Sequence, residues 1–531
     1  MRRKEQKTGT YRQMPTGLRD LTAVTVCKAV RAGLRILGRG GTALPGKAAL
    51  FLSPKVLETV SDGMEIFVVT GTNGKTTTAG ILAQALAESG RDVLINSSGA
   101  NLLSGITAEF ACDTDLHGRP RRRWAVVECD EGALRQAVPL LHPRVILVTN
   151  LFRDQLDRYG EVMQTLDRIR AGIPAADSGD RCTVCLNADD SLVSSLAESP
   201  AASSTGPVPQ GKRFRIRRFG LGPLTAQDRI RENADAQYCI RCGARYEYRY
   251  HTFAHLGGFF CPECGYERVN PETEVTEVLA ADADSVTVQI RTADTEQAAG
   301  NTKRQEVRIG LPALYNVYNA AGAVCAWQAA GLPAEEILQT LPLAEGSFGR
   351  MERFDVSGRQ VRMILAKNPA GCDQALSYLE GYAESYRLVL GLNNRTADGH
   401  DISWIWDADF ERIAADPKIT ECLVTGDRAE DMCLRMVYAG MPAGKIRMVR
   451  GEKELLGQIE RSGEQKDGVE PGDSLPPEPV LVLVNYTAML QLREALSRRS
   501  GKRAFWENGG RQEEGTAGRI CADQPRKGDT K

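Results

Sequence analysis

The stretch from residue 65 to 79 constrains this chain most, because an apolar run breaks into glycines and then into a helical pattern. Ile66–Val69 predicts a buried parallel strand, and Ile81–Leu86 predicts the helix that follows it. Between them, Gly71 and Gly74 let the backbone turn tightly and bring its N–H groups close to an anion, beside the positive end of the helix. This order of elements predicts a phosphate-binding loop.

The residues after the second glycine carry the chemistry of a nucleotide site. Lys75 supplies a mobile cation for terminal phosphates, and Thr76 supplies a hydroxyl suited to Mg²⁺. The loop is shorter than the general Gly-x-x-x-x-Gly-Lys-Ser/Thr pattern, because Gly71 stands only three residues before Gly74. The predicted nucleotide-binding residues of this loop are Gly71, Thr72, Asn73, Gly74, Lys75, Thr76 and Thr77.

Length and composition limit the possible classes of protein. A chain of 531 residues is long enough for about three or four domains with their own cores. A formal net charge of −1 gives no electrostatic reason to expect a nucleic-acid partner. Apolar runs are too short to span a membrane and the first residues lack the apolar core of a signal peptide, so we expect a cytoplasmic protein. Fourteen cysteines then favour reduced thiols or metal ligands over disulfides.

From about residue 65 to 180, strand patterns alternate with helix patterns, which is typical of a parallel sheet wrapped by helices. Glu128, Asn150 and Asp154 follow two of these strands at the carboxyl edge, where such sheets bind ligands. A carboxylate beside a phosphate loop favours a Mg²⁺ ligand over an ordinary surface position, so Glu128 is a metal candidate. The predicted strands are 66–69, 93–95, 125–128 and 145–149, and the predicted helices lie near 76–88, 131–138 and 157–171.

Four cysteines form a second constellation, Cys239, Cys242, Cys261 and Cys264, in the pattern C-x₂-C-x₁₈-C-x₂-C with a glycine after each pair. The spacing predicts a zinc ribbon, because each turn presents two thiolates and the two turns complete a tetrahedral site. Since that site leaves no position for water, the zinc should be structural. The two nearby histidines, His251 and His255, are expected on the ribbon surface rather than as ligands.

The two ends of the chain have simpler patterns. Residues 1–50 interleave basic and apolar side chains at helical spacing, which predicts a basic amphipathic helix ended by a loop at 38–46. That helix either packs on the first domain with its basic face in solvent or contacts anionic lipid. The last domain again alternates strands and helices, with a polar loop at 457–479. Its predicted strands are 361–365, 387–390, 421–425 and 480–484.

The segment Thr70-Gly-Thr-Asn-Gly-Lys-Thr-Thr-Thr78 resembles the ATP loop of the Mur ligases and folylpolyglutamate synthases, which activate a carboxylate with ATP and join it to an amine. The resemblance continues in the Asn-x-x-Asn helix at 316–319 and in Gly-Arg-x-Glu at 349–352. It implies that Lys75 and Glu128 are catalytic and that Thr76 and Glu128 hold Mg²⁺. It also implies that these residues contact ATP: Asn150, Asn316, Asn319 and Arg350. Gln155 replaces a family histidine, and 166–170 lacks the lysine that holds a second Mg²⁺, so that second site stays open.

Three features together resemble the MurT family: the ATP loop, the inserted ribbon, and Ala-Asp-Gly-His-Asp-Ile-Ser-Trp-Ile-Trp-Asp at 397–407. MurT proteins are the synthetase subunits of lipid II isoglutaminyl synthases, and their partner GatD is a glutaminase. The resemblance implies ATP-dependent amidation of the D-glutamate α-carboxylate of lipid II at the inner face of the membrane. It also implies that an aspartate of this chain completes the partner's Cys–His dyad, with Asp401 the first candidate and Asp398 the second.

The expected fold is thus α/β, with a Mur ligase-like central ATP-binding domain on a parallel sheet (51–345) and a C-terminal α/β domain that contacts the glutaminase (346–499). The zinc ribbon is inserted at about 225–275, a basic helix and loop precede at 1–50, and a disordered tail follows at 500–531. Two rivals remain. A stand-alone Mur or folate-type ligase would share the loop but leave the ribbon unexplained. A non-catalytic zinc-ribbon interaction protein would not need Lys75, Glu128 and Arg350.

Overall fold

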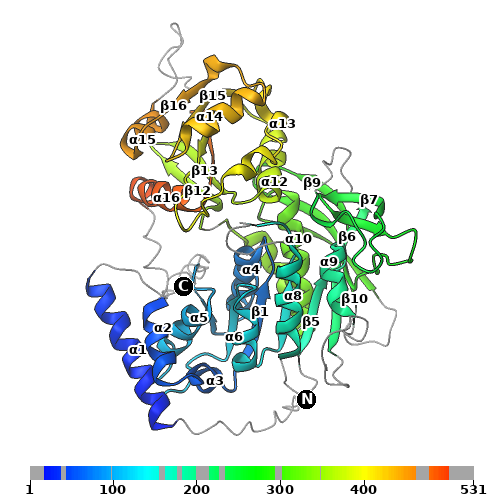
Figure 1. Ribbon diagram of the computed structural model, residues 1–531, viewed down its shortest axis with the longest axis vertical. Coiled ribbons are helices and arrows are strands. Elements are labelled where there is room, and N and C mark those ends of the chain that lie inside the picture. The colour runs from blue at the N-terminus through cyan, green and yellow to red at the C-terminus, as the bar shows by residue number, and fades with distance from the viewer. Residues whose placement is uncertain are drawn as a thin grey trace, which may run out of the picture.

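Two α/β units, each with its own sheet, make up the fold, and helices flank both sheets (Figure 1). The structure is a computed structural model, and it describes residues 17–37, 43–96, 99–115, 117–154, 162–175, 182–198, 214–225, 234–293, 302–346, 348–461 and 477–501. Gln155 and nearly all of the predicted tail lie outside the described residues. Among the helices described, none is long and apolar enough to cross a membrane.

The larger sheet has nine strands in the order β11-β10-β9-β6-β5-β4-β1-β3-β2. Strands β1 to β6 run parallel to their neighbours, whereas β10 pairs antiparallel with both β9 and β11. The four strands predicted in this unit are confirmed. The strand bounds are β1 Glu65–Thr70, β2 Val93–Ile95, β3 Trp124–Glu128, β4 Val145–Val148, β5 Thr183–Asn187, β6 Arg215–Leu224, β9 Thr273–Ala281, β10 Val286–Ala293 and β11 Thr302–Ile309.

Alternate side chains of β1 enter two different cores, because successive residues of a strand point to opposite faces of the sheet. Phe67 and Val69 pack with α4 and α10 on one face, while Ile66 and Val68 pack with the N-terminal helices on the other. The helix bounds are α1 Leu18–Ile36, α2 Ala43–Leu52, α3 Val56–Ser61, α4 Lys75–Glu88, α5 Leu103–Cys112, α6 Leu134–Leu141, α8 Val162–Gly172, α9 Ser191–Ser194, α10 Leu314–Ala329 and α11 Ala334–Thr340.

The N-terminal helices form a layer at one edge of the first unit, where α1 packs on α2 and both pack on α5 (Figure 1). Helix α2 begins at Ala43, so the predicted loop at 38–46 is wrong for 43–46, and its other residues lie outside the described ones. Gly46 lies against the backbone of α5, where a Cβ would come within 1.7 Å of the Ser104 carbonyl oxygen. The glycine therefore permits close helix packing instead of ending the helix.

The second unit is a six-stranded sheet in the order β12-β13-β17-β14-β15-β16, parallel except for the edge strand β12. The four strands predicted here are confirmed, but α15 extends into the predicted 457–479 loop. The bounds are β12 Arg350–Val356, β13 Arg359–Leu365, β14 Tyr386–Gly391, β15 Ile419–Thr425, β16 Ile446–Met448, β17 Val480–Val484, α12 Pro369–Glu380, α13 Glu411–Ala414, α14 Ala429–Tyr438, α15 Glu452–Glu460 and α16 Tyr486–Ser500.

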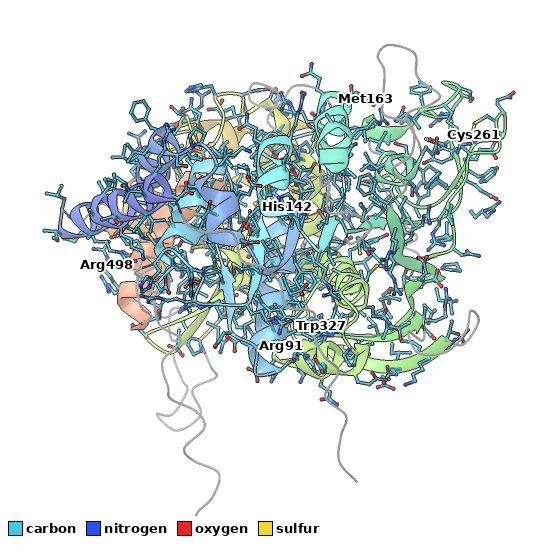
Figure 2. The ribbon with its side chains drawn as sticks, turned by 90° about the horizontal axis from the view of Figure 1, so that it is seen from below. Arg91, His142, Met163, Cys261, Trp327 and Arg498 are labelled. Atoms are coloured by element: carbon cyan, nitrogen blue, oxygen red, sulfur yellow. The ribbon has the colours of Figure 1, made fainter. Side chains whose placement is uncertain are left out.

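The cysteine-bearing segment is inserted between β6 and β9, and its hairpin pairs β7 (Glu247–Phe253) with β8 (Leu256–Phe260). Figure 2 shows Cys261 at the edge of the molecule opposite to the N-terminal helices, and Figure 1 shows β7 on that same side. The insertion therefore extends the first unit away from α1.

Candidate active site

A cavity of about 380 Å³ opens between the two units, next to the carboxyl ends of β1 and β3. The loop at 72–77 lines one wall, and Arg350 with residues 364–367 of the second unit lines the other. Glu128 and Asn319 also line this cavity, whereas Gly71, Asn150 and Asn316 do not. Most of the predicted nucleotide-binding residues therefore share one cavity, although they come from three separate segments of the chain: 72–77, Asn319 and Arg350.

Two glycines of the loop are required by its geometry. Gly71 has φ 118° and Gly74 has φ 86°, a region of the backbone map that side chains disfavour. A Cβ on Gly74 would come within 2.1 Å of Asn319 Oδ1, and a Cβ on Gly71 would come within 2.4 Å of Thr149 Oγ1. The loop therefore packs directly against the start of α10 and the end of β4, and no larger residue fits.

Other loop residues are used to brace the loop. Thr72 Oγ1 accepts a hydrogen bond from Phe152 N (3.1 Å). The Asn150 side chain pairs twice with the backbone of Asn73, because its Oδ1 accepts from Asn73 N (2.9 Å) and its Nδ2 donates to Asn73 O (3.1 Å). Asn150, expected at the nucleotide, thus holds the loop in shape.

Lys75 is buried and already has acceptors. Its Nζ lies 2.7 Å from Glu131 Oε1 and donates to the backbone oxygens of Gly71 and Thr72. Burial acts to lower the pKa of Lys75, but the attraction of Glu131 outweighs it, so the pKa lies above its usual value. A buried ammonium needs oxygen partners, and Lys75 finds them in its own loop and in Glu131; its role as a cation for the terminal phosphates stays a prediction.

Thr76 and Glu128, the two predicted Mg²⁺ ligands, lie side by side, with Thr76 Oγ1 donating to Glu128 Oε2 over 2.6 Å. Asn96 fixes Glu128 through both backbone groups, since Glu128 N donates to Asn96 Oδ1 (2.8 Å) and Asn96 Nδ2 donates to Glu128 O (2.9 Å). A hydroxyl and a carboxylate at a cavity wall suit a hard divalent cation. The sequence of α8 contains no lysine, so that helix lacks the lysine that holds a second Mg²⁺ in many Mur ligases.

Asn316 and Asn319 share one face of α10, as their spacing predicted. Asn319 Nδ2 donates to Asn316 Oδ1 (3.1 Å), and Asn316 Nδ2 donates to the Pro312 carbonyl (2.6 Å). Because only Asn319 lines the cavity, Asn316 positions its neighbour.

Arg350 extends from a turn whose backbone is strained on both sides. Phe348 has φ 49° and Met351 has φ 55°, values that are unusual for residues other than glycine. Among the described residues Arg350 forms no ion pair, and its guanidinium donates to the Phe348 carbonyl (3.4 Å). Burial lowers the pKa of Arg350. A cation without an ion-pair partner at a cavity wall is suited to an anionic ligand.

Glu352 holds this turn in place. Its Oε2 accepts from Gly349 N (2.7 Å), and its carboxylate forms a two-pronged ion pair with Arg493 of α16 (2.8 and 2.9 Å). The side chains of Glu352 and Arg493 are almost entirely buried. The glutamate of the Gly-Arg-x-Glu segment therefore supports the arginine and does not face the cavity.

Sequence reasoning missed several residues at this site. The sequence already places the segment that ends at Glu131 at the carboxyl edge of the sheet. The short spacing between Glu128 and Glu131 was the signal that could have identified Glu131 as a site residue. Lys367 forms an ion pair with Asp154 of the other unit, and Asn368 Nδ2 donates to Asn73 Oδ1 (3.3 Å). These contacts join the two units across the cavity, and no local pattern in the sequence shows them.

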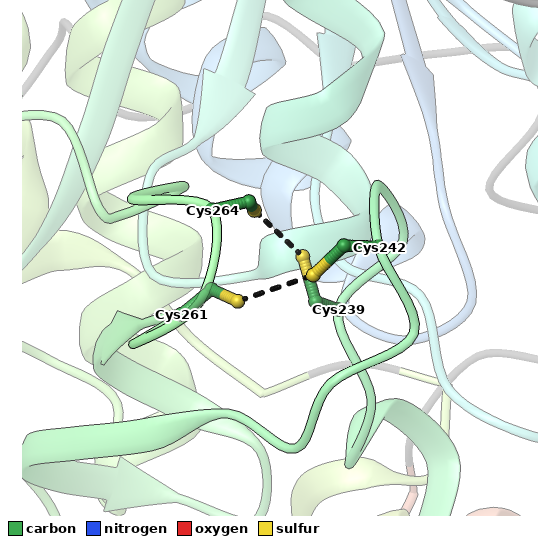
Figure 3. A group of neighbouring side chains, drawn as sticks. All are labelled: Cys239, Cys242, Cys261 and Cys264. Carbon is green, nitrogen blue, oxygen red and sulfur yellow. Dashed lines mark hydrogen bonds between the residues drawn. The ribbon is translucent and has the colours of Figure 1, made fainter.

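The candidate metal centre is formed by Cys239, Cys242, Cys261 and Cys264, whose sulfurs all lie within 4.8 Å of one another (Figure 3). The two turns have matching geometry, because Gly243 N donates to Cys239 O (2.8 Å) and Gly265 N donates to Cys261 O (3.0 Å). Burial opposes ionisation, yet backbone N–H groups lower the pKa of Cys239 to about 7. Four converging sulfurs, with one thiol readily ionised, fit a tetrahedral thiophilic ion.

The ribbon also touches the phosphate loop through one intermediate residue. The imidazole of His255 packs on Phe152, with ring centroids 4.7 Å apart, and Phe152 N is the group that binds Thr72. His255 is buried, so the expectation that it lies on the ribbon surface was wrong. The tertiary fold covers it because the β7–β8 turn folds back onto the first unit.

The two aspartates of the 397–407 loop have different surroundings. Asp398 is buried, and its carboxylate accepts from Thr487 N (2.7 Å) and Thr487 Oγ1 at the start of α16. Asp401 is exposed and accepts from Ser403 N (2.8 Å), and hydrogen bonding from the side chain and then the backbone of Ser403 lowers the pKa of Asp401. Asp398 thus fastens the loop to its own unit, whereas Asp401 is accessible at the surface as a carboxylate.

Comparisons with known proteins match both units of the chain to one family. A family model described as the MurT ligase C-terminal domain matches residues 365–489, and the Mur ligase middle domain model matches residues 69–207. The MurT subunit of lipid II isoglutaminyl synthase from Streptococcus pneumoniae is 34% identical, covering 87% of this chain and 94% of its own. The MurT subunit from Staphylococcus aureus strain N315 is 31% identical, covering 80% and 88%.

Solved structures support the fold. MurF from Acinetobacter baumannii has a TM-score of 0.56 at 16% identity and covers 85% of this chain and 80% of its own. The folylpolyglutamate synthase from Mycobacterium tuberculosis has a TM-score of 0.52 at 15% identity and covers 90% and 95%. At this identity the two structures bear on the fold alone, which is that of the Mur ligases.

Proposed function

Since this chain belongs to the MurT family, the Mur-type ligase subunits of lipid II isoglutaminyl synthases, we propose that it uses ATP to activate the D-glutamate α-carboxylate of lipid II for attack by ammonia. The observation that carries this proposal is the shared cavity. The phosphate loop, the Thr76–Glu128 pair and Arg350 all converge on it from two units.

The proposed reaction has two steps. A carboxylate oxygen of the substrate attacks the γ-phosphorus of ATP, ADP leaves, and an acyl phosphate forms. The nitrogen of ammonia then attacks the acyl carbon, the C–O bond to phosphate breaks, and the amide loses a proton. Such transfers depend mainly on positioning and on balancing negative charge.

The residues divide this work by chemistry. Arg350 is placed to contact phosphate oxygens with its forked donors. Lys75 remains protonated and adds a second positive charge beside the loop, and Glu131 holds it in position. Thr76 and Glu128 would hold Mg²⁺, which balances phosphate charge when bound. Among the family's expected ATP contacts, Asn319 is at the wall, while Asn150 and Asn316 act by support.

The cysteine cluster is proposed to bind zinc in a structural role. Four thiolates complete a tetrahedral coordination shell and leave no position for a reacting water. The cluster lies outside the cavity lining, so its contribution to catalysis is indirect. Through His255 and Phe152 it supports the loop that carries Thr72.

Ammonia is proposed to come from a glutaminase subunit docked on the second unit, and Asp401 is proposed to orient that partner's catalytic histidine. Its accessible carboxylate suits this role, whereas Asp398 is occupied by Thr487. An exposed apolar patch close by offers a docking surface: Trp406, Leu434, Val437 and Tyr438. The rings of Trp406 and Tyr438 lie 5.7 Å apart, so the 397–407 loop and α14 form one surface.

The test compares two nitrogen sources in the assembled complex. Asp401→Asn should suppress glutamine-driven amidation by about 10²-fold or more, because the histidine loses its orienting carboxylate. Ammonium supplied directly should restore most of the activity. Asp398→Asn is the matched control and should lower stability and both activities together, since it weakens the contact with α16.

The outcomes separate the alternatives. If Asp401→Asn keeps full glutamine-driven turnover, the proposed triad is wrong although the ligase chemistry stands. If the wild type turns over ATP with an amino acid and needs neither lipid II nor ammonium, the chain is a stand-alone ligase. If no ATP turnover occurs with lipid II and ammonium, the proposed function is wrong.

A further inference from the structure

The outward face of α1 carries almost no charge, although the helix is rich in basic residues. Lys28 and Arg31 turn toward the protein, where Lys28 donates to the Thr114 carbonyl (2.7 Å) and Arg31 pairs with Glu109 (2.9 Å). The exposed positions along the opposite stripe are Leu18, Thr22, Thr25, Ala29, Ala32, Gly33 and Ile36. The predicted packing of this helix on the first domain is confirmed by its contacts with α2 and α5. The predicted basic face is wrong for Lys28 and Arg31, whereas the exposed Arg19 and Arg35 match it.

Helix α2 extends this surface. Leu44, Lys47 and Phe51 are exposed at the i, i+3, i+7 positions of one helix face, and α2 packs along α1. Leu18 and Ile36 at the two ends of α1 are 84% and 86% exposed, and Phe51 is 86% exposed. We call the outward faces of α1 and α2 together the N-terminal face.

Basic side chains border this uncharged surface. Arg19 and Arg35 are the two exposed charged residues of α1, and both are positive. The nearby loop before β3 adds the exposed Arg119, Arg121 and Arg123, and its Thr114 is the partner of Lys28. An uncharged stripe with large apolar side chains at its ends, bordered by arginine and lysine, suits a helix that lies in the plane of an anionic membrane surface.

The same layer is joined to the active site. Helix α5 packs against both α1 and α2, and Asn101 and Leu102, which immediately precede it, line the cavity. Close backbone contact at Gly46 makes this junction tight. Any external surface that bound α1 and α2 would therefore also fix the position of the cavity relative to that surface.

We propose that the N-terminal face lies on the anionic surface of a membrane and so presents the cavity to a lipid-anchored substrate. A membrane is favoured over a second copy of this chain because the bordering charges are of one sign, which would repel across a twofold contact but attract anionic headgroups. The inference rests on the proposed function, since its related proteins are named for lipid II, a substrate held in a membrane.

The test measures flotation of the full chain, with its glutaminase partner, on vesicles of phosphatidylcholine with or without phosphatidylglycerol. Wild type should bind the phosphatidylglycerol vesicles and release in high salt, because exposed charges are screened. The triple variant Leu18→Ser/Ile36→Ser/Phe51→Ser should bind at least about tenfold more weakly, since burial of large apolar side chains contributes most of such binding. The matched control is Leu224→Ser/Leu279→Ser, which removes exposed leucines of β6 and β9 and should bind like wild type.

A second measurement separates this inference from the proposed function. The triple variant should amidate a water-soluble short-chain analogue of lipid II at the wild-type rate but lose activity on vesicle-embedded lipid II. If wild type fails to float, or if the triple variant floats equally well, the inference is wrong. The inference is also wrong if the triple variant loses self-association or binding of the glutaminase partner while its binding to vesicles is unchanged. Absence of amidation on both substrates, with vesicle binding intact, would reject the proposed function alone.

Discussion

Replacing Glu352 tests how the cation at position 350 is held. The carboxylate of Glu352 accepts from Gly349 N and pairs with Arg493, and the two side chains are 5% and 10% exposed. Glu352→Ala removes the carboxylate that pairs with the buried Arg493, and breaking one side of a buried ion pair typically costs about 3–5 kcal/mol. The strained φ angles at Phe348 and Met351, each worth roughly 1–3 kcal/mol, then lose the contact that maintains them.

Stability and nucleotide binding should respond differently. Glu352→Met/Arg493→Met removes both charges and refills the space, so it should destabilise less than Glu352→Ala or Arg493→Met alone. The KM for ATP should nevertheless rise by about 10- to 100-fold in Glu352→Ala and in the double variant, because a misplaced Arg350 loses about 1.4–2.8 kcal/mol of phosphate binding.

The assays are urea unfolding of each variant and ATP-dependent turnover with ammonium. A double variant whose loss of stability equals the sum of the two single losses would show that the pair is not coupled. An unchanged KM for ATP in Glu352→Ala would refute the claim that this glutamate positions Arg350.

Three further predictions concern the loop and the ribbon. Gly74→Ala should reduce ATP affinity by at least about tenfold with little loss of overall stability. The reason is that the new Cβ displaces Asn319 and strains the backbone at position 74. Isothermal titration with an ATP analogue measures the affinity. Lys75→Ala should abolish turnover and lower stability, because it leaves the buried Glu131 carboxylate without its cation, while the partner complex still assembles. Lys75→Ala/Glu131→Gln, which also removes that carboxylate charge, should recover stability but not activity. Cys239→Ser should contain no bound zinc in elemental analysis and should have a lower melting temperature, because a structural metal contributes directly to folding. A wild-type protein free of zinc would contradict the ribbon assignment.

The sequence alone was sufficient for the strands that it predicted in both sheets and for the backbone geometry of the loop between β1 and α4. Continuous apolar runs such as Val145–Val148 predict parallel strands, because a sheet covered on both faces buries every residue of a strand. Gly71 and Gly74 predict the phosphate loop because their backbone geometry excludes other residues. The cysteine spacing likewise predicts the cluster, since two short turns are enough to bring four sulfurs together.

The tertiary structure decided which of the chemically suitable residues face the cavity. Asn150 and Asn319 look alike in sequence, yet one braces the loop and the other lines the wall. Asp398 and Asp401 stand three residues apart, and only packing against α16 shows that the first is occupied. The outward direction of α1 depended on its partners in α2 and α5, because a helix with apolar residues on several sides does not specify by itself which side is buried.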